Sequence, residues 1–344
     1  MRNEHVKDVT IKDIAQHLGI SHPTVSRALR DHPSIRAETR LAVKEAARQL
    51  GYIANSGART LSRTRSELIG VIFPDVQNDF YSRTMSTLAS MFLERGFKLV
   101  LATSEDSAET EFKHIQSLRE ARVAGVIIAP TANLKNESVE LLRSIPTVQL
   151  LRSHPLLECS IIKLDERSGI ATAMEHLIEK GHSRIGFIGG SGTLSTGVDR
   201  AAGYIDALQG HGIPLMRALL RQGPPRPHFG YQAMSDMLSM KAPPSAVVMA
   251  SSELTLGGIE AIQERKISVP ADLALIAYHD PAWFKLWGAG ITCLRLPIEQ
   301  MAAAAAMRLL NQILADAKSP MCAGSETLDA DTPFASQLVV RGTT

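Results

Sequence analysis

Residues 9–30, V-T-I-K-D-I-A-Q-H-L-G-I-S-H-P-T-V-S-R-A-L-R, have the pattern of two short helices joined by a tight turn. Thr10 precedes an amphipathic run and Asp13 follows three residues later, which is the spacing of a capping box at a helix start. Apolar residues then recur at helical spacing. Gly19 ends the run, because a left-handed residue commonly follows a helix. The stretch therefore predicts a helix-turn-helix.

The second predicted helix has one polar face. Ser21 can cap its first turn, and Val25 and Leu29 face inward at a spacing of four residues. Its outer side carries His22, Thr24, Ser26, Arg27 and Arg30. A third helix is expected at about Ala37–Leu50, ended by Gly51, and would complete a small three-helix domain.

A helix-turn-helix places its second helix in the major groove, where Arg27 could pair with a guanine and Thr24 or Ser26 could reach bases or phosphates. The alternative is a three-helix scaffold with a solvated outer face. Charge favours DNA binding: residues 1–66 hold 12 Lys and Arg against 6 Asp and Glu, and the remainder holds 25 against 29. A basic head on a mildly acidic body is typical of a DNA-binding module joined to a part that does not contact DNA.

Further motifs continue in the same order along the chain. T-I-K-D-I-A, G-I-S, T-V-S-R-A-L, Y-I-A-N and A-R-T-L precede L-I-G-V-I-F-P at 68–74, E-K-G-H-S-R-I-G-F-I-G-G at 179–190 and V-P-A-D-L-A-L-I-A-Y at 269–278. Over nearly all of its length the sequence resembles the lactose-repressor-type (LacI/GalR) family of bacterial transcription regulators. The resemblance implies a sequence-specific DNA-binding regulator, usually a repressor, whose affinity for a palindromic operator is switched by a small effector.

The outer face and the resemblance together give the expected DNA contacts. They are Thr10, Ser21, His22, Pro23, Thr24, Ser26, Arg27, Arg30, Ser34, Thr39 and Tyr52, followed by Asn55, Ala58 and Leu61. His22 and Pro23 match the two positions that usually select the operator sequence. Pro23 offers no side-chain hydrogen bond, so His22 would carry any polar readout.

Asn55, Ala58 and Leu61 match a hinge helix that enters the minor groove, with Leu61 as the wedge between base pairs. Two residues depart from the family pattern. Ala54 stands where the family usually has Pro, and Gly57 lies inside the hinge at a helix cost of ~1 kcal/mol relative to Ala. So short a helix cannot form alone, and we expect it to order only on DNA.

Composition excludes several classes of protein. No run of about 18 apolar residues is present, so no membrane span is expected. The polar N-terminus has no signal-peptide core, which predicts a cytoplasmic protein. Cys159, Cys293 and Cys322 are odd in number and widely spaced, which favours reduced thiols over disulfides or a metal site. Neither a cofactor nor a metal is expected.

Beyond a short basic linker, strand and helix patterns alternate. Ile69–Phe73 is a continuous apolar run, as in a buried parallel strand. The alternation predicts an α/β body of doubly wound parallel sheets, and by resemblance this body is like the two-lobed periplasmic sugar-binding proteins. The expected division is 1–54 for the helix-turn-helix domain, 55–66 for the hinge helix and linker, and 67–344 for the effector-binding and dimerisation domain, with lobe one at about 67–164 and 297–328 and lobe two at about 165–294 and 331–342.

In such sheets, ligands bind beyond the carboxyl ends of the strands. Candidate effector contacts at these positions are Asn78, Phe80, Tyr81, Arg152, Thr196, Arg200, Ser251, His279 and Trp283. Phe80 and Trp283 have a second explanation, since each could pack inside its lobe.

Several of these positions depart from the family. Ser251 and Ser252 stand where the family often has Asn-Asp, His279 stands where an aspartate often binds sugar hydroxyls, and Leu296 replaces a frequent Gln. The cleft is therefore expected to lose carboxylates and to gain His279 beside Arg152 and Arg200. Such groups attract anions, which predicts a sugar acid or sugar phosphate as the effector, with a neutral sugar as the other possibility.

Two rival functions fit parts of the pattern. Gly190 and Gly192 follow a strand, as in a dinucleotide-binding loop, but Ser195 takes the place of the third glycine. No G-x-S-x-G or H-E-x-x-H motif is present either, so we do not expect an enzyme. A free solute-binding protein would explain the body but not the basic head.

The expected assembly is a homodimer. By resemblance, two copies pair through the lobe nearest the DNA head, along the helix at about Tyr81–Arg95, with Leu88, Ala89, Phe92 and Leu93 at the contact. Two heads then read the two halves of the operator.

Overall fold

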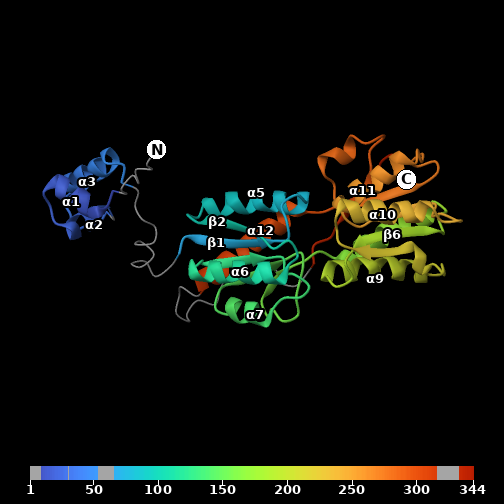
Figure 1. The fold of residues 1–344 in the computed structure, drawn as a ribbon, viewed down its shortest axis with the longest axis horizontal. Coiled ribbons are helices and arrows are strands. Elements are labelled where there is room, and N and C mark those ends of the chain that lie inside the picture. The colour runs from blue at the N-terminus through green and yellow to red at the C-terminus, as the bar shows by residue number, and fades with distance from the viewer. Residues whose placement is uncertain (1–8, 30, 53–65, 316–332) are drawn as a thin grey trace, which may run out of the picture. The chain divides into compact units, whose positions relative to one another are not determined.

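The computed structural model describes residues 9–29, 31–52, 66–315 and 333–344. The chain divides into two compact units, 1–66 and 67–344 (Figure 1). Arg30 and the expected hinge contacts Asn55, Ala58 and Leu61 lie outside the described residues.

In the first unit, the described residues form the helices α1 Ile11–Leu18, α2 His22–Leu29 and α3 Ala37–Gln49. The predicted capping box is confirmed: the Thr10 backbone N–H and hydroxyl both donate to Asp13 Oδ2, at 2.7 and 2.6 Å. Gly19 has φ +62° and ends α1 in the left-handed conformation. Ser21 precedes α2 and its hydroxyl lies 2.8 Å from that of Thr24.

A small apolar core holds these helices together. Ile14, Val25 and Val43 are fully buried, one from each helix, and Leu29 packs against them. Leu41 is 69% exposed and does not join this core. The three-helix arrangement thus follows from the apolar spacing of the sequence.

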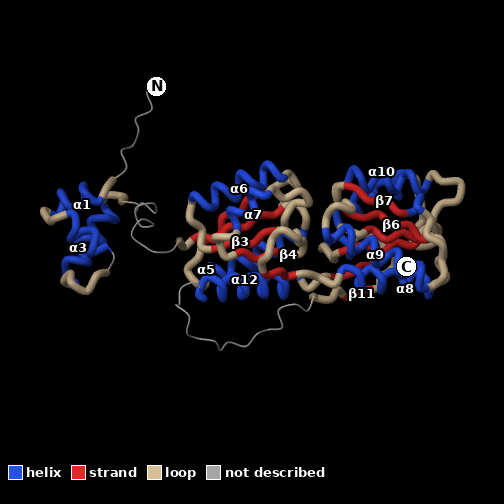
Figure 2. The backbone as a smooth tube through the Cα atoms, turned by 90° about the horizontal axis from the view of Figure 1, so that it is seen from below, coloured by secondary structure: helices blue, strands red, loops and turns tan. Residues whose placement is uncertain are grey.

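Lobe one of the second unit is built on a parallel sheet with strand order β2-β1-β3-β4-β5. Its strands are β1 Leu68–Phe73, β2 Lys98–Thr103, β3 Gly125–Ile128, β4 Thr147–Leu150 and β5 Ser160–Ile162. Its helices are α5 Asp79–Leu93, α6 Ala108–Glu120, α7 Asn136–Leu142 and α12 Ile298–Ala315. Figure 2 shows α5 and α12 on one face of the sheet and α6 and α7 on the other. Cover on both faces explains why β1 and β3 are continuous apolar runs.

Lobe two contains a six-stranded sheet with order β11-β10-β9-β8-β6-β7, in which only β11 is antiparallel to its neighbour. Its strands are β6 Ile185–Gly190, β7 Leu220–Gly223, β8 Ala246–Met249, β9 Ala274–Tyr278, β10 Thr292–Arg295 and β11 Gln337–Val339. Its helices are α8 Glu166–Glu179, α9 Ser195–Gly210, α10 Pro227–Leu238 and α11 Ser252–Glu264, with short 3-10 turns η1 Arg217–Leu219 and η2 Ala282–Lys285. The pairs α8–α9 and α10–α11 pack together on opposite faces of the sheet (Figure 2).

The chain crosses from lobe one to lobe two between β5 and α8, and returns between β10 and α12. The crossing expected near residue 330 lies outside the described residues. No described helix is both long and apolar enough to cross a membrane.

The expected dimer contact along α5 is wrong for two of its four residues. Leu88 and Phe92 are fully buried against the lobe's own sheet, because their spacing of four residues places both on the inward stripe of the helix. Ala89 and Leu93 lie on the outer side, and Leu93 is 70% exposed.

Candidate effector cleft and DNA-reading helix

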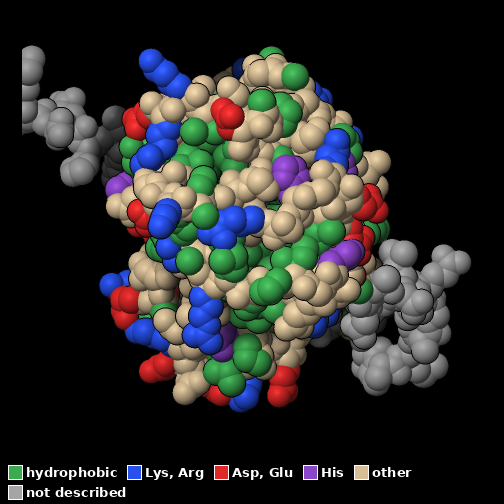
Figure 3. Space-filling model, turned by 90° about the vertical axis from the view of Figure 1, so that its right-hand side faces the viewer, with side chains coloured by type: hydrophobic (Ala, Val, Ile, Leu, Met, Phe, Trp, Pro, Cys, Tyr) green, Lys and Arg blue, Asp and Glu red, His purple; other side chains and the backbone are tan. Residues whose placement is uncertain are grey.

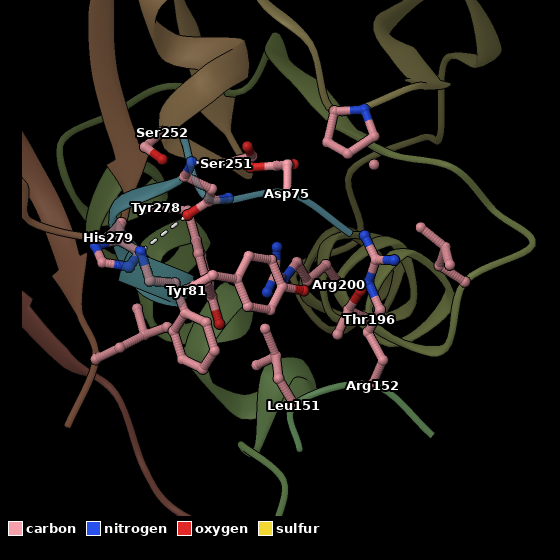
Figure 4. Close-up of a pocket in the computed structure, with 16 residues that line it drawn as sticks. Asp75, Tyr81, Leu151, Arg152, Thr196, Arg200, Ser251, Ser252, Tyr278 and His279 are labelled. Carbon is pink, nitrogen blue, oxygen red and sulfur yellow. Dashed lines mark hydrogen bonds between the residues drawn. The ribbon is translucent and has the colours of Figure 1, made fainter. Parts of the chain in front are cut away.

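A cavity of about 50 Å³ lies between the two lobes. Eight of the nine expected effector contacts line it: Asn78, Phe80, Tyr81, Arg152, Thr196, Arg200, Ser251 and His279. They follow the carboxyl ends of β1, β4, β6, β8 and β9, which is where doubly wound sheets bind ligands. Ser251, Ser252 and Asp75 lie on one side of the cavity, and Leu151, Arg152 and Thr196 lie on the other (Figure 4).

Trp283 is not among the lining residues. Its ring packs edge-on against that of Phe284, with 4.5 Å between centroids, and belongs to the core of lobe two. The interpretation of Trp283 as packing for the lobe, rather than as a cleft wall, fits this position. Phe80 has both roles: it is 2% exposed, lines the cavity and meets His279 edge-on at 6.1 Å.

Other lining residues were not among the expected contacts. They are Asp75, Leu151, Gly190, Leu194, Pro225, Ser252, Tyr278 and Leu296. Tyr278 is the last residue of β9 and Asp75 follows β1 by two residues, so their position at strand ends is the signal that could have identified them.

Arg200 is held in a buried cluster. Its Nε and Nη2 donate to the two carboxylate oxygens of Glu166, each at 2.7 Å, and its Nη1 donates to the Ala250 carbonyl at 2.8 Å. The guanidinium also stacks on the Tyr278 ring, 3.9 Å from its centroid, and the Tyr278 hydroxyl donates to Glu166. Burial lowers the pKa of Arg200, but the charge and hydrogen bonds of Glu166 outweigh it, so the pKa lies above its usual value. Burial raises the pKa of Tyr278 far above 10, and the phenol stays neutral.

Arg152 is also buried and paired. It is 5% exposed, and its Nη1 donates to Asp106. Burial lowers the pKa of Arg152, and the opposing effect of neighbouring acidic groups, Asp106 among them, raises it above its usual value. Both arginines that line the cavity therefore have a carboxylate partner.

His279 contributes no charge near neutral pH. Burial, assisted by the charges of Arg83 and Arg200, lowers its pKa to about 3. Its Nδ1 accepts the Asp280 backbone N–H at 3.1 Å, so the neutral ring carries its proton on Nε2. Nε2 has no hydrogen-bond partner among the described residues.

The expected Arg152, Arg200 and His279 all line the cavity, but their charges are compensated or absent. Glu166 and Asp106 pair with its arginines, His279 is neutral, and the Asp75 carboxylate on the wall is paired with Arg226. The unpartnered polar atoms are neutral: Ser251 Oγ, Ser252 Oγ and His279 Nε2 form no hydrogen bond with any described group. Buried polar atoms rarely remain unpaired in a folded protein, so these three atoms have hydrogen-bonding capacity that no described group uses.

Two residues at the cleft have a strained backbone. His279 has φ +88° and Leu151 has φ +65°, both in the region that residues with a Cβ seldom adopt. Such strain is commonly found at ligand sites, where the surrounding structure enforces it.

Polar contacts between described residues join the lobes at the cleft, His279 Nδ1 to Asp79 Oδ2 at 3.7 Å among them. Arg226 of lobe two lies 3.3 Å from Asp75 of lobe one, and the Ser153 backbone N–H donates to the Ser195 hydroxyl at 3.0 Å. The cavity has room for only a few water molecules. A sugar-sized ligand therefore requires the lobes, or side chains between them, to move apart.

The helix α2 exposes the residues expected to read DNA. His22, Pro23 and Arg27 are exposed, while Thr24 and Ser26 are partly buried. Thr10, Ser21 and Ser34 are exposed as well, and Thr39 and Tyr52 are partly buried. All described members of the expected set lie within the first unit.

Comparison with known proteins agrees with this two-part organisation. A family model described as "Bacterial regulatory proteins, lacI family" matches residues 10–55, and one described as "Periplasmic binding protein-like domain" matches residues 174–344. The HTH-type transcriptional regulator GalR of Salmonella typhimurium (strain SL1344) is 31% identical over 298 residues, which cover 86% of this chain and 87% of that protein. The chain belongs to the lacI family of bacterial regulatory proteins.

Solved structures of this lacI-family fold match nearly the whole chain. The Lac repressor dimer bound to operator and the anti-inducer ONPF has a TM-score of 0.82 at 24% identity, covering 98% of this chain and 99% of that one. The transcriptional regulator CelR–cellobiose complex has a TM-score of 0.71 at 25% identity, with 98% and 100% covered. The lacI-family chain described here is a DNA-binding transcription regulator rather than an enzyme.

Proposed function

We propose that this lacI-family regulator binds a palindromic operator as a homodimer, and that a small carbohydrate-type effector in the cleft controls its affinity. The observation that carries the proposal is the cavity between the lobes, where three buried polar atoms lack partners. Two of the similar structures are complexes with small molecules, ONPF and cellobiose, which supports control by a small carbohydrate-type effector. Repression is the expected output, and the cytoplasm is the expected compartment because the target is chromosomal DNA.

The proposed division is 1–54 for the DNA-reading domain, 55–66 for the hinge and linker, and 67–344 for the body. Figure 3 views lobe two from its far end, where Lys and Arg are mixed with Asp, Glu and apolar side chains over the coloured surface. That face offers no broad basic patch for DNA, in keeping with a body that binds the effector while the head binds DNA.

The head is proposed to read DNA through the outer face of α2. Its contacts are the described residues Thr10, Ser21, His22, Pro23, Thr24, Ser26, Arg27, Ser34, Thr39 and Tyr52, with Arg30, Asn55, Ala58 and Leu61 beyond the described part. Arg27 is exposed, and its planar fork suits the paired acceptors of guanine.

Substitution of Arg27 by Ala should relax base preference at one position of each half-site, by about 1–3 kcal/mol of discrimination. The measurement is binding to a set of duplexes that differ by single base pairs, at fixed salt. Arg48→Ala removes an equal charge from α3 and should leave base preference intact. Uniform weakening over all duplexes would place Arg27 on phosphate instead.

The homodimer is proposed to form through lobe one, along the edge strand β2 and the outer side of α5. Val100 and Leu101 of β2 and Leu93 of α5 are exposed apolar residues in this region. An uncovered edge strand with apolar side chains is a surface that proteins normally protect by pairing. In such a dimer, an effector that changes the angle between the lobes of each chain would change the distance between the two DNA-reading domains.

Leu101→Asp should therefore shift the protein from dimer to monomer and weaken operator binding by about tenfold or more, since two linked heads bind far better than one. Sedimentation velocity and an operator titration would measure the two effects. Leu314→Asp is the matched control, because Leu314 is an exposed leucine at the end of α12 in the same lobe. An unchanged dimer in Leu101→Asp would contradict this interface.

A further inference from the structure

The Arg200 cluster has a consequence for the ligand that the cleft can accept. A guanidinium has five N–H donors. Two are taken by Glu166 and one by the Ala250 carbonyl, while the Tyr278 ring covers one face. Arg200 therefore retains at most two N–H groups for further hydrogen bonds, and its charge is already compensated by the buried Glu166 carboxylate, 2.7 Å away.

Glu166 itself is enclosed behind this wall. It is 3% exposed, begins α8, and accepts hydrogen bonds from Arg200 and from Tyr278. It is not among the residues that line the cavity. Any effect of Glu166 on a ligand therefore passes through Arg200 and Tyr278, which do line it.

Among the described residues, the rest of the cavity wall offers no unpaired cation to an anionic ligand. Arg152 is paired with Asp106, Arg226 is paired with Asp75, and His279 is neutral. The groups with spare hydrogen-bonding capacity are hydroxyls, an imidazole N–H and the two remaining N–H groups of Arg200. Such groups match the hydroxyls of an uncharged polyol, whereas a buried carboxylate or phosphate needs a cation of its own.

We propose that Glu166 is a specificity-determining residue: by neutralising Arg200, it makes the cleft select an uncharged polyhydroxylated ligand over a carboxylate or phosphate of the same shape. This inference rests on the proposed function of the cleft as the effector site. Glu166 acts as a positioning residue, since it contacts Arg200 and not the ligand.

The test uses ligand pairs that differ in charge but share a ring shape. The probes are glucose with glucuronate, galactose with galacturonate, and glucose with glucosamine, together with inorganic phosphate. Full-length wild type is compared with E166Q, R200Q and the E166Q/R200Q double variant by thermal unfolding over a range of ligand concentrations. The matched control is E175Q, which removes one exposed glutamate from the same helix.

Wild type and E175Q should be stabilised by an uncharged sugar at concentrations where the matching acid has no effect. In E166Q the charge of Arg200 is no longer paired, so a charge-assisted hydrogen bond to an anion becomes available. E166Q should therefore respond to the acids or to phosphate at a concentration about tenfold lower, or lower still, than wild type requires. R200Q leaves the carboxylate and should prefer glucosamine to glucose. The double variant should show neither preference.

A wild-type protein that binds an acid better than its neutral partner would overturn the inference, even if no variant folds. The inference would also be overturned if E166Q and E175Q responded equally to acids and phosphate, or if neither variant responded to them. Failure of the proposed function has a different signature: ligands bind with the expected charge preference, but operator affinity does not respond to them. A merely structural role of Glu166 would lower the melting temperature of E166Q without changing its charge preference.

Discussion

Replacement of Arg200 by Ala is expected to lower the free energy of unfolding by about 3–5 kcal/mol, because it leaves a buried carboxylate without its cation. Arg200 is 9% exposed, and Glu166 would retain only the Tyr278 hydroxyl as its described side-chain partner. Loss of the stacking on Tyr278 adds to the effect. Urea unfolding at pH 7.5 would measure the difference.

The chain offers a matched control for this prediction. Arg167 of α8 pairs with Asp206 of α9, so this ion pair joins the same two helices as the Glu166–Arg200 pair. It is largely exposed, and exposed pairs contribute little to stability. Arg167→Ala should leave the urea midpoint nearly unchanged. Equal losses in the two variants would contradict the assignment of Arg200 to a buried, strongly coupled cluster.

The second large effect is a loss of stability on mild acidification that depends on His279. The folded pKa of about 3 lies well below the ordinary value of 6.5, with burial as the main cause. Between these values the unfolded chain binds a proton that the folded protein does not. The contribution of this site is complete above pH 6.5 and is lost as the pH falls, by about 2 kcal/mol at pH 5 and about 4 kcal/mol at pH 3.

The groups around His279 act on its pKa in both directions. Asp79 Oδ2 lies 3.7 Å from Nδ1, and the charges of Asp280 and Glu299 also favour protonation. Burial and the charges of Arg83 and Arg200 oppose it and outweigh them. The folded ring therefore stays neutral at pH 5.

His279→Asn isolates this contribution. Asn tolerates the left-handed conformation that φ +88° requires, and it does not titrate. Between pH 7.5 and pH 5, wild type should lose about 2 kcal/mol more of its unfolding free energy than the variant. The same pH dependence in both proteins would show that His279 is not the titrating group.

Much of the fold was predictable because its signals are local. The Thr10–Asp13 capping box and the left-handed Gly19 are set by residues within one helical turn. The apolar runs of β1 and β3 report cover on both sides of a sheet. By contrast, β5 contains only three residues, and so short a run has no period that distinguishes it from a loop.

The positions of the cleft residues were predictable, but their charge states were not. The carboxyl ends of parallel strands meet at one edge, so eight of the nine expected contacts reach the cavity. Glu166 is 34 residues from Arg200 in the sequence, and Asp106 is 46 residues from Arg152. No sequence pattern at that separation links an arginine to its counter-ion, so the cleft seemed positively charged until tertiary structure supplied the partners.

The central claim is that the cleft and the DNA-reading head are coupled. The most direct test is an operator titration, first without ligand and then with a saturating concentration of the sugar that stabilises wild type. Coupling free energies of this kind are typically ~1–3 kcal/mol, so the operator dissociation constant should change by roughly 5- to 150-fold. An operator affinity that stays the same at saturating ligand would contradict the account.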